Sequence, residues 1–476
     1  MQLTKTKYIN IAIRIALTFI IALCPPVGKI TPYGMKALGV FVSVLYGWLT
    51  VDLLFPSIWG FASIAVLGLM SSADSLSVGL GNTQVVAILA AMAFAGALDA
   101  VGVTKAIANW MLTKEIMRKS PWLLVIGIVA TSFVLGIAGA ALAAMLLLWQ
   151  ILGQIADKGN IPKGDGLLSF MLIMVTLAAF CGMFALPFHA TTMIFVGYFI
   201  QTIGSGFETV PFMIVALTTF LVVLTAMVLL GKFVFRFDAS KFIMPQEVIE
   251  EMKNEKVSFE TKVGLIVLVV YMLALIVPSV FTSLPGAAIC NALGVAGLSI
   301  IGMMVLAVVS IGGNSVINLG KVWTKYTEWP LVLLLAVTFP IAEVIRSADA
   351  GIMPTVMGVV LPIVSKMGIL PFMIAVIIVL GLLTQVTHNI VLAAMFTPFL
   401  IPLCAQMGGN IYTMWFIMFF ALNASYVTPA ASFQSAMVFG LERMSSKWAY
   451  ILGTAILIVT WIVCIIVTIP LANALF

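Results

Sequence analysis

Long apolar runs separated by short polar segments dominate the chain. About 20 predominantly apolar residues span a bilayer as an α-helix, so each long run predicts a membrane-spanning helix. We predict eleven such helices, two of which are broken inside the membrane. The expected positions are an N-terminal helix ending at Cys24, then residues 35–50, 53–70, 84–98, 167–203, 211–234, 263–280, 297–311, 329–345, 412–440 and 448–475.

The pattern changes at a polar stretch, residues 384–389, which separates two shorter apolar runs, 374–383 and 390–400. Each run has about 10 residues, roughly half of a bilayer span. Two half-length helices that meet at a polar tip predict a re-entrant hairpin near 371–404, since irregular backbone at membrane depth needs protein or water around it. Polar groups at such a tip indicate a binding site. The alternative is a plain spanning helix with satisfied hydroxyls.

An earlier block predicts a second hairpin, near 121–155, because the glycine-containing segment 136–140 interrupts it. Pro187 and Pro429 each break a long apolar run. Each half of the chain therefore follows one order: spanning helices, a surface segment, a hairpin, a broken helix and a final helix. An odd number of crossings in each half makes the halves inverted, which is typical of secondary transporters that bind substrate near the membrane midplane.

This order divides the chain into four parts, and amphipathic or polar stretches lie between the apolar runs. Surface segments are expected at 99–120 and 346–367, and a polar loop at 71–83. The four parts are an N-terminal helix (1–33), a first repeat (34–236), a cytoplasmic linker (237–262) with a short surface helix at most, and a second repeat (263–476).

Composition supports the membrane assignment independently. Hydrophobic residues form 63% of the 476-residue chain and charged residues 8%, and the mean hydropathy is +1.22. A soluble globular protein of this size does not have such a composition, so the chain is an all-α polytopic membrane protein. The five cysteines show no metal-binding or disulfide spacing and are expected to be buried packing residues.

The distribution of positive charge predicts the orientation. If the N-terminus, the 99–120 segment, the linker and three further loops lie inside, only four of the 23 Lys and Arg residues remain outside; these are Lys29, Lys36, Arg346 and Lys366. Cytoplasmic loops carry an excess of Lys and Arg. We therefore expect an inner-membrane protein whose N-terminus is cytoplasmic and whose C-terminus is outside.

Several motifs resemble the divalent anion:sodium symporter family of the ion transporter superfamily. They are Pro25-Pro26-Val-Gly28, Trp48-Leu-Thr50-Val-Asp52, Trp323, Glu328-Trp329, the stretch from Thr384 to Ala394 with Pro398, and the stretch from Pro429 to Gly440. The resemblance covers nearly the whole chain in order. It implies scaffold and transport domains, an elevator-type motion and a homodimer.

The resemblance also implies a set of binding residues. Substrate would be bound by the two hairpin tips and the two helix breaks, that is by Thr387, His388, Asn389, Ser432, Ser435, Gly139, Ala140, His189 and Thr191. The family carries Ser-Asn-Thr at both tips, where these residues also help to form two sodium sites. Here the first tip reads Ala138-Gly139-Ala140, and Ser132 alone keeps a hydroxyl near the first sodium site. A second sodium site could use Thr384, Thr387, Asn389 and the carbonyl of Ala431, because hard cations need several oxygens.

The chain has two histidines, His189 at the first helix break and His388 at the second tip. Each imidazole could carry a proton near neutral pH or donate a hydrogen bond to an anion, and the alternative is a neutral ring satisfied by backbone carbonyls. The N-termini of half-helices at the tips would favour an anion further.

The leading function is cation-coupled transport of a small organic anion, most simply a di- or tricarboxylate, with a proton or a single sodium ion as the coupling ion. An anion exchanger without cation coupling and an anion channel are the alternatives. An intramembrane enzyme is disfavoured, because neither His-Glu-x-x-His nor Gly-x-Ser-x-Gly occurs in the chain. No cofactor and no nucleic-acid partner are expected.

Overall fold

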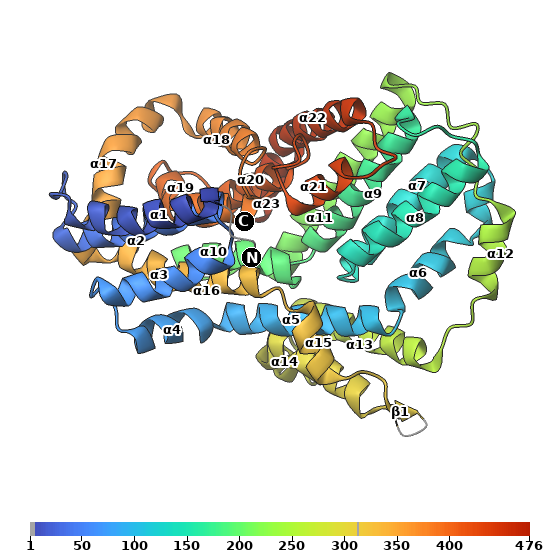
Figure 1. The fold of residues 1–476 in the computed structure, drawn as a ribbon, viewed down its shortest axis with the longest axis horizontal. Coiled ribbons are helices and arrows are strands. Elements are labelled where there is room, and N and C mark those ends of the chain that lie inside the picture. Colours follow the sequence, from blue (N-terminus) through green and yellow to red (C-terminus); the bar gives the residue numbers. More distant parts are fainter. Residues whose placement is uncertain (1–4, 312–313) are drawn as a thin grey trace.

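The computed structural model describes residues 5–311 and 314–476, and the fold of these residues is helical apart from one short antiparallel ladder. The ladder pairs β1 (Ser310–Ile311) with β2 (Asn314–Ser315). The first part of the chain (Figure 1) forms α1 (Lys5–Leu23), α2 (Pro32–Thr50), α3 (Leu54–Val66), α4 (Ser72–Leu80), α5 (Thr83–Ala100), α6 (Val103–Leu112), α7 (Pro121–Ile137), α8 (Ala141–Lys158), α9 (Gly166–Phe184), α10 (Ala190–Ile203) and α11 (Thr209–Leu229), which a π-helical turn extends to Val234.

The second part begins with the short linker helix and is also mainly helical. It forms α12 (Gln246–Asn254), α13 (Phe259–Val280), α14 (Ala287–Val308), α15 (Leu319–Tyr326), α16 (Trp329–Arg346), α17 (Ile352–Val364), α18 (Ile369–Leu383), α19 (Asn389–Gln406), α20 (Ile411–Asn423), α21 (Phe433–Phe439), α22 (Ser446–Val463) and α23 (Ile469–Leu475), and a π-helical turn joins α22 to α23.

Nine helices among the described residues are long and apolar enough to cross a membrane, or ten if a bent pair counts as one span. The bent pair consists of residues 352–367, which are α17 and the turn after it, and α18. The chain bends by 111° between the two. The protein is therefore a multi-pass membrane protein, as its composition predicts. The predicted surface segment 346–367 contains an apolar helix, and α3 and α20 are shorter than the spans expected there.

Two expectations about local structure were wrong. The arms of the second hairpin have 15 and 18 residues rather than half-length runs, because α19 continues through Pro398 and Pro402. Membrane helices tolerate proline where neighbouring groups satisfy the freed backbone. The polar segment 71–83 is not a loop but contains α4, whose N-cap Ser71 accepts a hydrogen bond from the Asp74 backbone N–H (3.1 Å).

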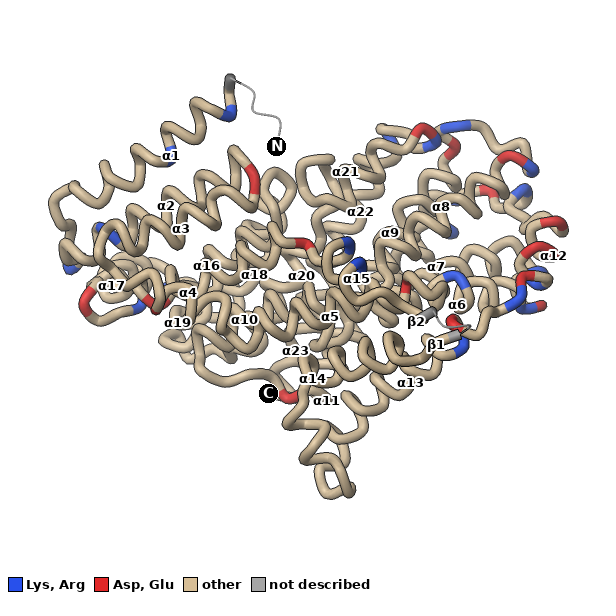
Figure 2. The backbone as a smooth tube through the Cα atoms, turned by 60° about the horizontal axis from the view of Figure 1, so that its bottom comes forward, with Lys and Arg blue, Asp and Glu red and all other residues tan. Residues whose placement is uncertain are grey.

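Charged loops from distant parts of the sequence meet on one side of the molecule. Lys158 pairs with Glu247 (2.6 Å) and Arg443 with Asp157 (2.8 Å), which joins the end of α8 to the linker and to the loop after α21. Figure 2 shows charged positions gathered around α6, α8 and α12. We call this side, formed by loops 159–165, 235–258 and 440–445, the linker face.

Aromatic rings mark the opposite face, where loops 204–208 and 407–410 lie with the C-terminus. The ring of Phe476 stacks on Tyr412 (4.6 Å between centroids) and meets Phe207 edge-on at 5.8 Å. The loop before α11 and the loop before α20 therefore share one side with the C-terminal residue.

The two broken helices run in opposite directions between these faces. The pair α9–α10 begins beside the linker face at Asp165 and ends at the opposite face before Phe207, whereas α20–α21 begins near Tyr412 and ends before Arg443. Both pairs are interrupted, at residues 185–189 and 424–432.

The two hairpins also open to opposite faces. The α7–α8 hairpin begins near the linker face, where Lys232 lies over the Trp122 ring (5.7 Å to the centroid), and ends at Lys158. The α18–α19 hairpin opens at the other face, since Ile369 at its start packs on Gly409 of the loop that follows it. Each hairpin packs on the helix that follows it, α9 for the first and α20 for the second (Figure 1).

Glycines bring α7 and α9 into backbone contact. A Cβ on Gly136 would lie 2.0 Å from the Ala179 carbonyl oxygen, and one on Gly182 would lie 2.0 Å from the Phe133 carbonyl oxygen. Small residues permit such close packing where lipid provides no hydrophobic force between helices. The first hairpin is therefore held tightly against the helix that leads into the break.

Candidate functional site

The second hairpin tip, residues 384–388 between α18 and α19, lies against the break between α20 and α21. Thr384 is fully buried and donates its hydroxyl hydrogen to the Leu422 carbonyl (2.9 Å) near the end of α20. This bond satisfies one of the carbonyls that a helix C-terminus leaves without a partner. The tip is thus attached to the helix end beside it.

Gln385 connects the hairpin tip to the break through both the nitrogen and the oxygen of its buried side-chain amide. Its Nε2 donates to the Ala424 carbonyl (3.0 Å) and to the Gly381 carbonyl (2.7 Å), and its Oε1 accepts from the Val427 backbone N–H (3.0 Å). Thr428 also donates its hydroxyl hydrogen to the Gln385 carbonyl. The irregular backbone at 424–428 therefore obtains partners from the hairpin, as membrane-depth backbone requires.

Asn389 begins α19 and pairs with an asparagine on α20. Its Nδ2 donates to Asn423 Oδ1 (2.9 Å), while Asn423 Nδ2 donates to the Phe419 carbonyl (2.8 Å). Both side chains are buried. This pair places two amides at the junction of hairpin and break, where they could reach a polar ligand or an ion.

His388 is half-buried and caps α19, with its Nδ1 accepting from the Ile390 backbone N–H (3.3 Å). An Nδ1 that accepts a hydrogen bond carries no proton, so this geometry assigns the proton of the neutral ring to Nε2. Protonation of Nδ1 would remove the cap. The same Ile390 N–H also donates to Asn389 Oδ1 (2.9 Å), which would remain as its acceptor.

The polar residues of the second break hold its loop in a tight turn. Ser432 donates to the Ser425 carbonyl (2.8 Å) and caps α21 by accepting from the Ser435 N–H (3.2 Å), and the Ser435 hydroxyl donates to the Thr428 carbonyl (2.7 Å). Ala431 is fully buried, and its N–H donates to the Thr428 carbonyl. The Ser425 hydroxyl is buried with no hydrogen-bond partner among the described residues.

The first hairpin tip, residues 138–140, contacts the break between α9 and α10 through a histidine. His189 Nε2 lies 2.7 Å from the Ile137 carbonyl oxygen at the end of α7, so the ring donates there. Gly139 adopts a φ of +84°, which favours glycine, and a Cβ at this position would lie 3.3 Å from His189 Cε1. Backbone and imidazole therefore form this tip without any hydroxyl or amide side chain.

Two helices begin at the first tip without side-chain caps. Ala140 precedes α8 and His189 precedes α10, and neither side chain accepts a hydrogen bond from the first turn of its helix. The N–H groups of these first turns can bind an anion, which the helix dipole also favours. The first tip thus offers backbone donors where the second offers side chains.

The remaining predicted residues lie deeper in the first half. Ser132 is buried in α7 and donates to the Val175 carbonyl (2.6 Å), so its hydroxyl is directed at α9 and not at the tip. The Thr191 hydroxyl lies 3.9 Å from the sulfur of Met183. Thr192 is the residue that bonds across the break, to the Met183 carbonyl (3.2 Å).

The structure thus forms two clusters from the predicted residues. The first contains Gly139, Ala140 and His189. The second contains Thr384, Thr387, His388 and Asn389 of the hairpin and Ala431, Ser432 and Ser435 of the break, which the bonds of Gln385 and Thr428 join. The helices that begin after the two histidines, α10 and α19, pack against each other. The described residues contain no group of three His, Cys, Asp or Glu side chains that could bind a metal ion.

Sequence reasoning missed three residues of the second cluster: Asn423, Ser425 and Thr428. It included Gln385 in the polar stretch but not among the binding residues. A signal was available for Asn423 and Thr428, since both polar residues flank a helix break that Pro429 marks in the sequence. The amide network of Gln385 depends on tertiary contacts between segments about 40 residues apart, which no local pattern reveals.

A scan of the chain against models of known protein families finds no match, and a search of curated proteins finds no relative.

Proposed function

We propose that this protein is a secondary active transporter of a small organic anion, with a di- or tricarboxylate as the simplest substrate. One observation carries the proposal: two helical hairpins open to opposite faces, and each tip contacts the break of the helix pair that follows it. Discontinuous helices that meet near the midplane are the usual binding sites of secondary transporters.

The opposite directions of the broken helices support an inverted repeat within this proposal. The repeats would be residues 34–236 and 263–476, joined by the linker 237–262. In a membrane, the linker face would be cytoplasmic because its loops carry six Lys and Arg residues, whereas loops 204–208 and 407–410 of the opposite face carry none. Phe476 would then lie outside. The resemblance to divalent anion:sodium symporters adds a homodimer with scaffold and transport domains and an elevator-type motion.

The anion would be bound between the two clusters. Uncapped N–H groups at the starts of α8 and α10 would attract negative charge, and Asn389, Ser432 and Ser435 would contribute side-chain donors. No acidic side chain occurs in residues 136–143, 185–192, 384–389 or 423–435 to repel a carboxylate. A tip without fixed charge also suits a site that must release its ligand on both sides.

The proposal allows two coupling ions, sodium and the proton. A sodium ion would need the oxygens of Thr384, Thr387, Asn389 and Ala431 around a shared centre, so the side chains of Thr384 and Asn389 would have to leave their present partners. A proton would need only His388, whose cap on α19 is lost when Nδ1 is protonated. Exchange of one anion for another would need neither ion.

Uptake into proteoliposomes tests the proposal. The purified protein would be reconstituted and offered a panel of labelled mono-, di- and tricarboxylates, with sodium and pH gradients imposed separately. We expect saturable uptake of at least one di- or tricarboxylate that one of the gradients increases. Uptake that requires only an internal anion would identify an exchanger, and conductance without saturation would identify a channel. No uptake of any carboxylate would overturn the proposal.

A further inference from the structure

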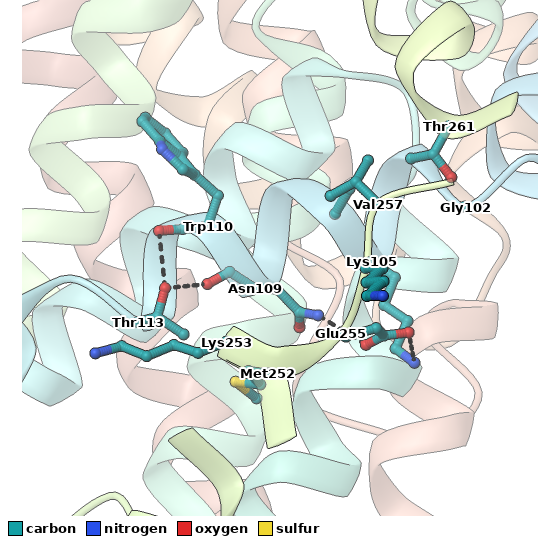
Figure 3. Close-up of a pocket in the computed structure, with 12 residues that line it drawn as sticks. Gly102, Lys105, Asn109, Trp110, Thr113, Met252, Lys253, Glu255, Val257 and Thr261 are labelled. Carbon is teal, nitrogen blue, oxygen red and sulfur yellow. Dashed lines mark hydrogen bonds and ion pairs between the residues drawn. The ribbon is translucent and has the colours of Figure 1, made fainter. Parts of the chain in front are cut away.

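A cavity of about 330 Å³ lies between α6 and the linker, well separated in sequence from both hairpin tips. The α6 side contributes Lys105, Asn109 and Trp110, and the linker side contributes Lys253 (Figure 3). Lys256 of the linker also lines the cavity. Figure 3 shows Glu255 between Lys105 and Asn109, and the Lys253 side chain extending past Thr113. The cavity is open to the surface, so a ligand can enter without rearrangement of the fold.

The lining of the cavity has a positive excess. Lys105 pairs with Glu255 (2.5 Å), and Asn109 Nδ2 donates to the other oxygen of the same carboxylate (2.9 Å). The hydrogen bond from Lys105 lowers the pKa of Glu255, so this carboxylate is ionised and already has two partners. Lys253 and Lys256 are exposed and have no ion-pair partner among the described residues. Two ammonium groups therefore remain for an anionic ligand.

The cavity lies where membrane-spanning helices end. The candidate span α5 ends two residues before Gly102, and the candidate span α13 begins two residues before Thr261; both Gly102 and Thr261 line the cavity. Thr261 Oγ1 donates to the Val101 carbonyl (2.6 Å), which holds the two helix ends together. This position corresponds to the headgroup region of a bilayer.

Helix α6 has the pattern of a helix that lies in the membrane surface. Its buried residues are Val103, Thr104, Ala108 and Leu112, while Lys105 and Trp110 face outward. The Trp110 side chain is 62% exposed, and Lys114 Nζ lies 4.3 Å from its ring centroid. Tryptophan is enriched at the level of lipid headgroups, and lysines beside it attract anionic lipids.

We propose that the cavity between α6 and the linker binds the phosphate headgroup of an anionic phospholipid. Lys253 and Lys256 would form charge-assisted hydrogen bonds to the phosphate oxygens, while the exposed ring of Trp110 would lie beside the glycerol region. A bare phosphate ion would leave much of a 330 Å³ cavity unfilled, and the exposed apolar side chain of Val257, which lines the cavity, suits the start of acyl chains. A bound headgroup would tie α6 to the linker.

Binding of defined lipids to the full-length protein tests this proposal. Native mass spectrometry of the detergent-purified protein would compare phosphatidylglycerol with phosphatidylcholine over a concentration series. The test variant is Lys253→Ala with Lys256→Ala. The matched control is Lys241→Ala with Lys262→Ala, which removes the same charge from exposed lysines near the same segment that do not line the cavity.

We expect phosphatidylglycerol to bind more tightly than phosphatidylcholine. Each basic residue near an anionic surface contributes about 1 kcal/mol, which corresponds to roughly fivefold in affinity, so the double test variant should bind phosphatidylglycerol about 25-fold more weakly. The control variant should keep its affinity within about twofold. Equal binding of the two lipids, or an equal loss in both variants, would overturn the proposal. Displacement of the lipid by millimolar inorganic phosphate would also overturn it, since the ligand would then be a soluble phosphate.

Discussion

Replacement of Gln385 by alanine should loosen the second hairpin from the break that it contacts. The substitution removes an amide that serves the Ala424 carbonyl and the Val427 N–H at the same time. Neither group has another backbone partner among the described residues. The hydroxyl of Thr428 would still bond to the backbone carbonyl of residue 385, because that acceptor is not part of the side chain.

The magnitude follows from the two groups left without partners. A buried polar group that loses its partner costs about 1–3 kcal/mol. Val427 is only half-buried, so a hydrogen bond from its N–H to water offsets part of this cost. We therefore expect Gln385→Ala to lower the free energy of opening this contact by about 2–4 kcal/mol. An effect of this size raises the population of the open state by roughly 30- to 800-fold.

Hydrogen exchange measures this change locally. Peptides that cover residues 384–390 and 424–432 should exchange faster in Gln385→Ala by that factor, while peptides from α9 should not change. The control is Val386→Ala, at a neighbouring tip position whose side chain is 69% exposed. If Gln385→Ala and Val386→Ala exchange at the same rate in both segments, the amide does not hold the hairpin and the reasoning is refuted.

Three further predictions concern separate regions. The Arg14 guanidinium is buried with no hydrogen-bond partner among the described residues and lies over the rings of Phe55 and Trp59. Arg14→Met should therefore raise the free energy of unfolding by about 1 kcal/mol or more, and a lower free energy of unfolding would contradict this. Cysteine labelling should find Lys253 cytoplasmic and Phe476 outside; labelling of both from one side would refute the inverted repeat. His388→Ser should flatten the pH dependence of uptake between about pH 5 and 8 without abolishing it, and absence of sodium-free uptake at every pH would exclude proton coupling.

The sequence was informative where a single element carries its own signal. Pro187 and Pro429 mark both helix breaks, and Gly139 marks the first tip with a conformation that favours glycine. Hydropathy predicts the membrane spans because burial in lipid selects for apolar residues at every position. These signals are local, so they can be found without knowing what packs on them.

The sequence misled us about helix boundaries where neighbouring groups provide hydrogen-bond partners for polar side chains and for backbone next to prolines. The short apolar runs on either side of residues 384–389 suggested half-length arms, yet α19 extends to Gln406 through Pro398 and Pro402. Polar residues at 71–83 suggested a loop, although Ser71 caps a helix there. The bonds of Gln385 and Asn423 could not be predicted either, because the partners Ala424 and Asn389 lie on segments that only the fold brings together.

Access to the second tip from both sides of the membrane tests the central claim most directly. Thr387→Cys in a cysteine-free variant would be labelled with a membrane-impermeant maleimide from each side, with Phe476→Cys as a control for a residue that should label from one side only. We predict that Thr387→Cys labels from both sides and that the transported anion slows the reaction. Labelling of Thr387→Cys from a single side, at a rate that no carboxylate changes, would contradict a substrate site at this tip.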